Sequence, residues 1–158
     1  MKLNFKKIGE GKPLLILHGL FGSSDNWGTL GKKFAENNLV YLIDLRNHGR
    51  SPHSKEMSYD HMADDLLELI EDEKIYLPVI LGHSMGGKAA LMFTEKYPKY
   101  VDKLVVADIG TKAYPMHHDD ILKGLNSVNL QEISSRTQAQ QSIQVHIDNL
   151  GVQQFLLK

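Results

Sequence analysis

The sequence predicts an α/β protein with a mostly parallel sheet that is covered by helices on both faces. Short apolar runs of strand length recur along the chain, at residues 14–17, 39–43, 79–81 and 103–107. Continuous apolar runs of this length are typical of parallel strands that are buried on both faces. Segments with helical spacing of apolar residues separate these runs. This alternation predicts right-handed crossovers between parallel strands.

The other elements of this region follow from local signals. Residues 2–8 carry a looser apolar pattern that predicts an edge strand, and Gly9–Gly11 supplies its turn. Helices are expected in three places: from Ser24 or Asp25 to about Asn38, from Ser58 onward, and from the turn at Ser84 to Tyr97, which precedes a proline.

The pattern changes after Gly110. Apolar residues then recur at helical intervals, but no further strand is visible up to Lys158. We expect several short helices joined by polar turns, and we expect them to form a lid over Ser84. The predicted boundaries are therefore 1–112 for the α/β core and 113–158 for the helical lid.

Length and composition limit the classes of function. The 158 residues suffice for one core, and the net charge of -1 gives no basic surface of the kind that nucleic-acid binding needs. The lack of cysteine excludes a disulfide framework and a thiol nucleophile. No apolar run approaches the ~20 residues that span a bilayer, and the N-terminus lacks the apolar core of a signal peptide. We expect a cytoplasmic protein that does not bind nucleic acid or a membrane.

The pentapeptide G-x-S-x-G stands at Gly82–Gly86, between an apolar run and a helical segment. A serine on so tight a turn has a strained backbone, and the residues two before and two after it must be nearly without a side chain. The hydroxyl of Ser84 is then lifted above the carboxyl edge of the sheet. The N–H of Met85, at the start of the helix, points to where an oxyanion would form. The order of strand, glycine turn and helix predicts a nucleophilic serine.

Other polar residues also fall at the carboxyl ends of the predicted strands. They are His18, which is followed by Gly19 and Leu20, then Asp44 and Asp108. Parallel α/β sheets bind ligands beyond these ends, so we expect the candidate site there.

The chain resembles the α/β-hydrolase fold in four segments: HGLFGSSDNW at 18–27, DLRNHGRS at 44–51, GHSMGGKAAL at 82–91 and VVADI at 105–109. More narrowly, it is similar to the small cytoplasmic esterases and thioesterases of the bacterial YbfF type. The resemblance implies the residues of an acyl-transfer site: Ser84 as the nucleophile, the amides of Leu20 and Met85 as the oxyanion hole, and Asp108 as the acid of the triad. It implies no cofactor.

The catalytic histidine departs from the family's pattern. In this fold the triad order is serine, acid, histidine, and the family's histidine follows its last strand. This chain looks shortened before that strand. After Asp108 its histidines are His117, His118 and His146, the last within a predicted lid helix, and none stands at the expected place. The run from His117 to Asp120 offers metal-ligand side chains, but adjacent positions rarely converge on one ion. We interpret it as a solvated helix start and expect no metal.

Several other residues have structural interpretations. His18 and His48 are expected to hold loops by hydrogen bonds, and His83 to pack against a neighbouring loop. Asp44 is expected to stabilise its loop with Arg46 or Arg50 as partner. Trp27 is expected to pack under the oxyanion loop, the segment His18–Leu20 that carries the Leu20 amide.

Three functional hypotheses follow. The first is a serine hydrolase that cleaves acyl esters or thioesters through an acyl-enzyme on Ser84. The second is an inactive fragment of such an enzyme, or one that depends on self-association or on a missing C-terminal half. The third is a C–C hydrolase or lyase of the menaquinone-synthase type, for which Arg46, Arg50 and Arg136 are too scattered to grip a dicarboxylate.

Overall fold

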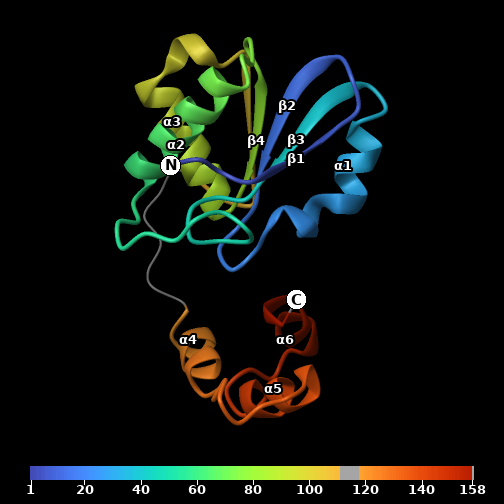
Figure 1. Ribbon diagram of the computed structural model, residues 1–158, viewed down its shortest axis with the longest axis vertical. Helices are drawn as coiled ribbons and strands as arrows, with labels where there is room; N and C mark the ends of the chain where they lie inside the picture. The colour runs from blue at the N-terminus through green and yellow to red at the C-terminus, as the bar shows by residue number, and fades with distance from the viewer. Residues whose placement is uncertain (111–117, 158) are drawn as a thin grey trace. The chain divides into compact units, whose positions relative to one another are not determined.

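The computed structural model describes residues 1–110 and 118–157. The chain divides into two compact units, Met1–Thr111 and Lys112–Lys158, which are described separately. The first contains the sheet and the second consists of short helices (Figure 1).

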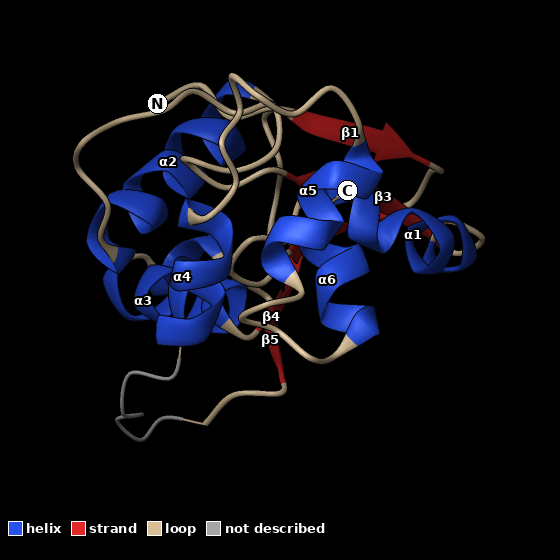
Figure 2. Ribbon diagram, turned by 90° about the horizontal axis from the view of Figure 1, so that it is seen from below, coloured by secondary structure: helices blue, strands red, loops and turns tan. Residues whose placement is uncertain are grey.

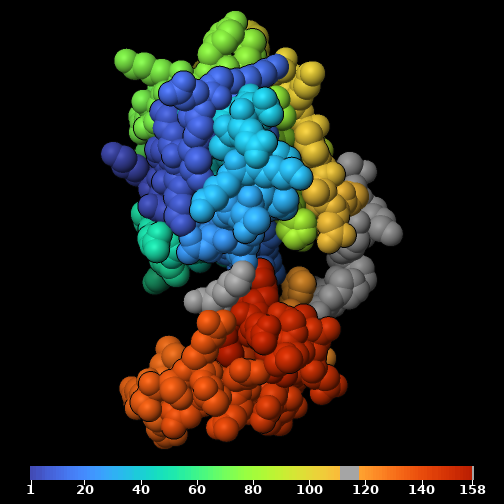
Figure 3. Space-filling model, turned by 90° about the vertical axis from the view of Figure 1, so that its right-hand side faces the viewer, coloured from blue at the N-terminus to red at the C-terminus, as the bar shows by residue number. Residues whose placement is uncertain are grey.

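The sheet of the first unit has five strands within residues 1–110, in the order β1-β3-β2-β4-β5. Their bounds are Phe5–Ile8 for β1, Lys12–Leu17 for β2, Asn38–Ile43 for β3, Val79–His83 for β4 and Lys103–Ala107 for β5. β1 pairs with β3 in antiparallel orientation, and the other neighbours are parallel. The mostly parallel sheet and the edge position of the first strand are confirmed. β5 forms the opposite edge, and its residues are visible in yellow on the surface in Figure 3.

Helices cover both faces of this sheet. α2 (Tyr59–Asp72) and α3 (Met85–Lys96) lie on one face and α1 (Gly28–Phe34) on the other (Figures 1 and 2). Side chains of β2 alternate between the two faces: Leu15 and Leu17 belong to the core under α2 and α3, and Ile16 to the core under α1. This double burial explains why the strand is apolar at every position.

The sequence predicted where two of these helices begin, at Ser58 and at Ser24 or Asp25. Ser58 caps α2, and its hydroxyl accepts the N–H of His61 at 3.2 Å. The helix expected from Ser24 or Asp25 through Phe34 is present, but residues Ser24–Trp27 form a 3-10 turn, and α1 itself begins only at Gly28. The Ser24 N–H is bonded to Asp44 Oδ1 at 2.6 Å, which holds the chain in this tighter turn.

The second unit contains three helices within residues 118–157. They are α4 (Asp119–Asn126), α5 (Arg136–Ile143) and α6 (Leu150–Leu156), and Ile143 and Ile147 are buried among them. The expected short helices are confirmed, but the placement of His146 in a helix is wrong. α5 ends at Ile143, whose carbonyl accepts the N–H of both His146 and Ile147 at 3.0 Å, so His146 lies in a turn. In the described part of the chain, every helix is too short or too polar to span a bilayer.

Candidate active site

Ser84 occupies a strained turn between β4 and α3. Its backbone has φ 51° and ψ -115°, in the left-handed half of the map, which is costly for any residue but glycine. The turn is held on both sides: the Ser84 N–H donates to the Ala107 carbonyl at 3.0 Å, and the Ser84 carbonyl accepts the Gly87 N–H at 2.9 Å. The predicted strand, turn and helix are therefore present, with the serine at the carboxyl end of β4.

The two glycines of the pentapeptide are required by close backbone approach. A Cβ on Gly82 would lie 2.3 Å from the Gly86 carbonyl oxygen, and one on Gly86 would lie 2.5 Å from the carbonyl oxygen of Leu17. The first of these oxygens belongs to α3 and the second to β2, so neither can move without shifting a packed element. These distances explain why the positions two before and two after Ser84 must lack a side chain, as the sequence predicted.

The loop that follows β2 lies beside the serine. A Cβ on Gly19 would be 3.4 Å from the Cβ of Ser84. Leu20, the next residue, and Met85, the first residue of α3, carry the two amides expected to bind an oxyanion. Neither amide donates a hydrogen bond to another described residue. Both N–H groups therefore remain available to a ligand, as the donors of an oxyanion hole must be.

His18 fixes this loop from within the core. Its side chain is buried, Nε2 accepts the Leu45 N–H at 3.0 Å, and Nδ1 donates to the Gly19 carbonyl at 2.8 Å. Burial lowers the pKa of His18 to about 4, so the ring is neutral at pH 7, as both bonds require. The ring of His48 packs at 5.1 Å from that of His18, and its Nδ1 bonds to the Arg46 carbonyl at 2.9 Å. The loop-holding roles expected for both histidines are confirmed.

Asp44 is the anchor of the same region. Its carboxylate accepts the N–H groups of Ser24 at 2.6 Å and Arg50 at 3.0 Å and the side-chain amide of Asn4 at 2.8 Å. Burial alone would raise the pKa of Asp44, but these donors outweigh it and the pKa lies below its usual value. Of the two partners expected from the sequence, Arg50 is confirmed, although it binds through its backbone N–H. The side chain of Arg46 pairs elsewhere.

The Arg46 guanidinium is bound to the buried carboxylate of Asp65 on α2, with distances of 2.6 and 2.9 Å. A guanidinium held in this way cannot also grip a dicarboxylate substrate. Arg136 belongs to the second unit and donates to the Gln154 carbonyl at 3.2 Å. The third hypothesis, a dicarboxylate-binding lyase, therefore gains no support from either arginine.

Asp108 stands at the carboxyl end of β5, next to the end of β4. It has φ 55°, and its side chain is 86% exposed. Its Oδ2 lies 3.6 Å from Nε2 of His83, the residue before the serine. The sequence suggested that His83 packs against a neighbouring loop, and the ring does lie against Gly19 and edge-on to Trp27. The contact with Asp108 was missed, because it depends on how β4 and β5 are paired.

Trp27 packs into the core under α1 as well as against His83, at 6.2 Å between ring centroids. Trp27 therefore has a packing role, as expected, and its contacts are with this core and with His83.

Within residues 1–110, no imidazole bonds to the Ser84 hydroxyl, so a base for Ser84 is not found in the first unit. Of the candidates named from the sequence, His117 lies outside the described residues. His118 precedes α4, and His146 lies in the turn after α5, both in the second unit.

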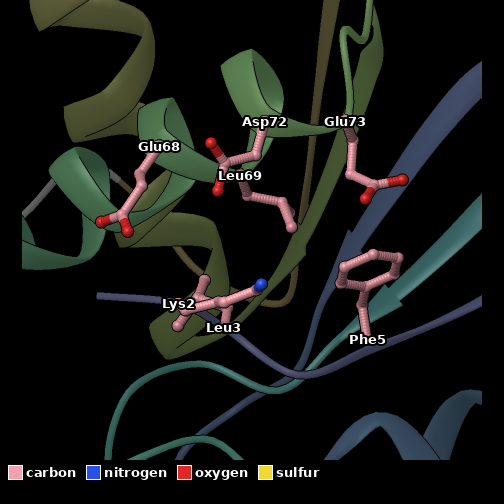
Figure 4. A pocket seen from close by; sticks show the side chains of 7 residues that line it. All are labelled: Lys2, Leu3, Phe5, Glu68, Leu69, Asp72 and Glu73. Carbon is pink, nitrogen blue, oxygen red and sulfur yellow. The ribbon is translucent and has the colours of Figure 1, made fainter.

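A hollow elsewhere in the first unit is unsuitable as a substrate site. The hollow between the start of the chain and α2, lined by Lys2, Leu3, Phe5, Glu68, Leu69, Asp72 and Glu73, has a volume of ≈ 20 Å³ (Figure 4). That space holds about one water molecule and no acyl substrate. Among the described residues, no three histidine or carboxylate side chains are arranged to bind a metal ion.

Comparisons with known proteins agree with this geometry. A family model described as the alpha/beta hydrolase fold matches residues 12–128. The chain is 37% identical to the esterase YbfF of Escherichia coli, over 100% of this chain and 65% of that protein. It is also 37% identical to the sn-1-specific diacylglycerol lipase ABHD11 of Danio rerio, over 97% of this chain and 51% of that protein.

The solved structure of a marine microorganism esterase superimposes with a TM-score of 0.96 and 44% identity, over 99% of this chain and 62% of that one. The chain thus spans between about half and two thirds of the length of these relatives. With the family model matching most of its residues and the serine turn in place, the chain belongs to the α/β-hydrolase fold family.

Proposed function

We propose that the chain carries the nucleophile, oxyanion hole and acid of a serine esterase that cleaves acyl esters or thioesters. The observation that carries this proposal is the strained backbone of Ser84 between two glycines that admit no side chain, with the Gly19 loop against it. Strain of this kind persists only where the surrounding structure holds it, and it is characteristic of functional sites. The relatives named as an esterase and a lipase support the class of substrate.

The proposed reaction proceeds in two steps. Ser84 Oγ attacks the acyl carbonyl carbon and gives its proton to an imidazole base. The carbonyl oxygen becomes an oxyanion held by the amides of Leu20 and Met85. The C–O or C–S bond then breaks, and the leaving group takes the proton from the imidazolium. Water repeats the sequence on the acyl-enzyme and releases the acid, while Asp108 orients the imidazole throughout.

A second candidate function is that of a folded but nearly inactive chain. It is favoured by one observation, that no imidazole within residues 1–110 bonds to the Ser84 hydroxyl. In that case the base comes from another polypeptide segment or from a second copy of the chain. Removing a triad member leaves only the residual rate enhancement from the oxyanion hole and substrate binding, roughly 10³-fold to 10⁴-fold over water.

The proposal is tested with a fluorophosphonate probe and p-nitrophenyl esters. We expect the probe to label Ser84, identified by peptide mass, and we expect Ser84→Ala to abolish labelling and ester turnover. Ser54→Ala, in a loop away from the turn, is the matched control and should leave both unchanged. Ester hydrolysis at the same rate in Ser84→Ala would refute the proposal. Labelling that needs a second polypeptide would favour the second candidate.

A further inference from the structure

His83 stands between the two parts of the site that flank the serine. It is the last residue of β4, directly before Ser84, and its side chain is 39% exposed. Neither the predicted mechanism nor the core uses this imidazole. Its contacts reach the oxyanion loop on one side and the end of β5 on the other.

The first set of contacts involves the oxyanion loop. A Cβ on Gly19 would lie 3.0 Å from Nδ1 of His83, 3.3 Å from its Cε1 and 3.4 Å from the Cβ of Ser84. The imidazole and the serine therefore rest against the same glycine. Trp27 also contacts the ring in an edge-on arrangement, at 6.2 Å and 64°. A ring that packs against both Gly19 and Trp27 limits how far the loop that carries Leu20 can shift toward it.

The second contact involves the acid. Nε2 of His83 lies 3.6 Å from Oδ2 of Asp108. This separation is a close polar contact and not a hydrogen bond. Within the described residues, no hydrogen bond and no lysine or arginine holds this carboxylate, which is 86% exposed on its left-handed turn. One carboxylate oxygen thus faces His83, and Oδ1 is left for a base. A carboxylate that orients a catalytic base works only if its own position is fixed.

We propose that His83 is a positioning residue that holds the Gly19 loop and the Asp108 carboxylate in place on two sides of Ser84. The proposal has two parts. The effect of His83 on catalysis rests on the proposed function, because His83 would act through the oxyanion amide and the triad acid. The contacts of the His83 ring with the Gly19 loop and with Asp108 do not depend on that function, so the two parts need separate measurements.

The structural part is tested by NMR on the full chain, without any substrate. The His83 ring resonances are identified by their loss in His83→Gln. We expect Asp108→Asn to shift these resonances and Asp102→Asn, a carboxylate paired with Lys12 before β5, to leave them unmoved. Trp27 is the only tryptophan, so its indole N–H signal is unambiguous. It should shift in His83→Ala and much less in His83→Phe, which refills the space. Unmoved ring resonances in Asp108→Asn would overturn the proposal, whether or not the chain is an enzyme.

The catalytic part uses the rate at which Ser84 reacts with the fluorophosphonate probe. His83→Phe keeps the packing against Gly19 and Trp27 but cannot contact the carboxylate through a ring nitrogen. We expect it to slow labelling about 10-fold, and His83→Ala, which loses both contacts, up to about 100-fold. His83→Gln places an amide near the position of Nε2 and should recover most of the rate. His53→Phe, an exposed histidine elsewhere, is the control.

A double-mutant cycle separates positioning from general damage. If His83 acts through Asp108, then His83→Phe should slow labelling much less in an Asp108→Asn background than in the wild type. Equal slowing in both backgrounds, or no rescue by His83→Gln, would overturn the proposal. A wild-type chain that is not labelled at all would instead contradict the proposed function, and the NMR measurement alone would then decide the role of His83.

Discussion

At the residue scale, the site depends on backbones that approach too closely for side chains. Gly86 and Gly28 make a matched pair, since both are helical glycines of the first unit. A Cβ on Gly86 would meet the carbonyl oxygens of Leu17 and His18 at 2.5 and 2.6 Å, whereas a Cβ on Gly28 would meet nothing within 4 Å. The same substitution should therefore have opposite effects at the two positions.

We predict that Gly86→Ala lowers the free energy of unfolding by about 1–3 kcal/mol, because the backbone must shift to admit the methyl group. Gly28→Ala should be neutral or stabilise by up to about 1 kcal/mol, because alanine restricts the unfolded chain at no steric cost. Urea unfolding followed by circular dichroism measures both. Equal effects would mean that the close approach at Gly86 is not a constraint.

His18 gives a prediction on pH dependence. Its pKa falls from about 6.5 in the unfolded chain to about 4 in the folded one, so between these values the unfolded state binds more protons. The free energy of unfolding should therefore decrease by roughly 3 kcal/mol as the pH falls from 6.5 to 4. The depressed pKa of Asp44 acts in a separate window, and its contribution is lost only as the pH falls below about 4.

Unfolding midpoints measured at a series of pH values check this. A His18→Gln variant should be less stable at pH 7 and should lose most of the slope between pH 6.5 and 4. A slope that persists in this variant would assign it to another group.

At the element scale, the pair of Arg46 and Asp65 joins the loop after β3 to α2. Both side chains are buried and share two hydrogen bonds. Removing Asp65 leaves the Arg46 guanidinium buried without its carboxylate, which is far more costly than losing an exposed pair. Asp64, the next residue of α2, is the natural comparison, because it is half exposed and paired with Lys96 on the surface.

We predict that Asp65→Ala lowers the free energy of unfolding by about 3–5 kcal/mol. Asp64→Ala should cost less than about 1 kcal/mol, because solvent screens its pair. Thermal unfolding of both variants at one pH and salt concentration makes the comparison. A small effect of Asp65→Ala would show that water reaches the Arg46 guanidinium.

At the scale of the whole molecule, the sequence predicted the parts that depend on periodicity. The parallel strands, the helices between them and the serine turn follow from apolar runs and glycine spacing, and they were confirmed. The contacts of Asp44 with Asn4 and Ser24 were not predictable, because these donors come from two segments distant in the sequence, whereas Arg50 lies in the same loop. The contact of His83 with Asp108 was hidden for the same reason, since it depends on strand pairing. Local patterns specify elements, whereas contacts between their ends require the assembled sheet.

The division into two units predicts two different stabilities. β2 lies inside the sheet with both faces buried, and Leu15, Ile16 and Leu17 are fully enclosed. The second unit has a small core around Ile143 and Ile147. Regions with few buried apolar contacts open locally at a lower free energy than the global transition. Amide hydrogens of α4–α6 should therefore exchange with solvent faster than those of β2.

Hydrogen exchange followed by mass spectrometry tests this division, with Ile143→Ala as the decisive variant. Loss of this fully buried side chain should destabilise the second unit by about 2–5 kcal/mol and speed exchange in α4–α6. Exchange in β2 should be unchanged, because the sheet has its own core. Leu15→Ala, which creates a cavity of similar size in the first unit, should speed exchange in β2 and leave exchange in α4–α6 unchanged. If either variant speeds exchange in both units equally, the two units unfold as one cooperative body.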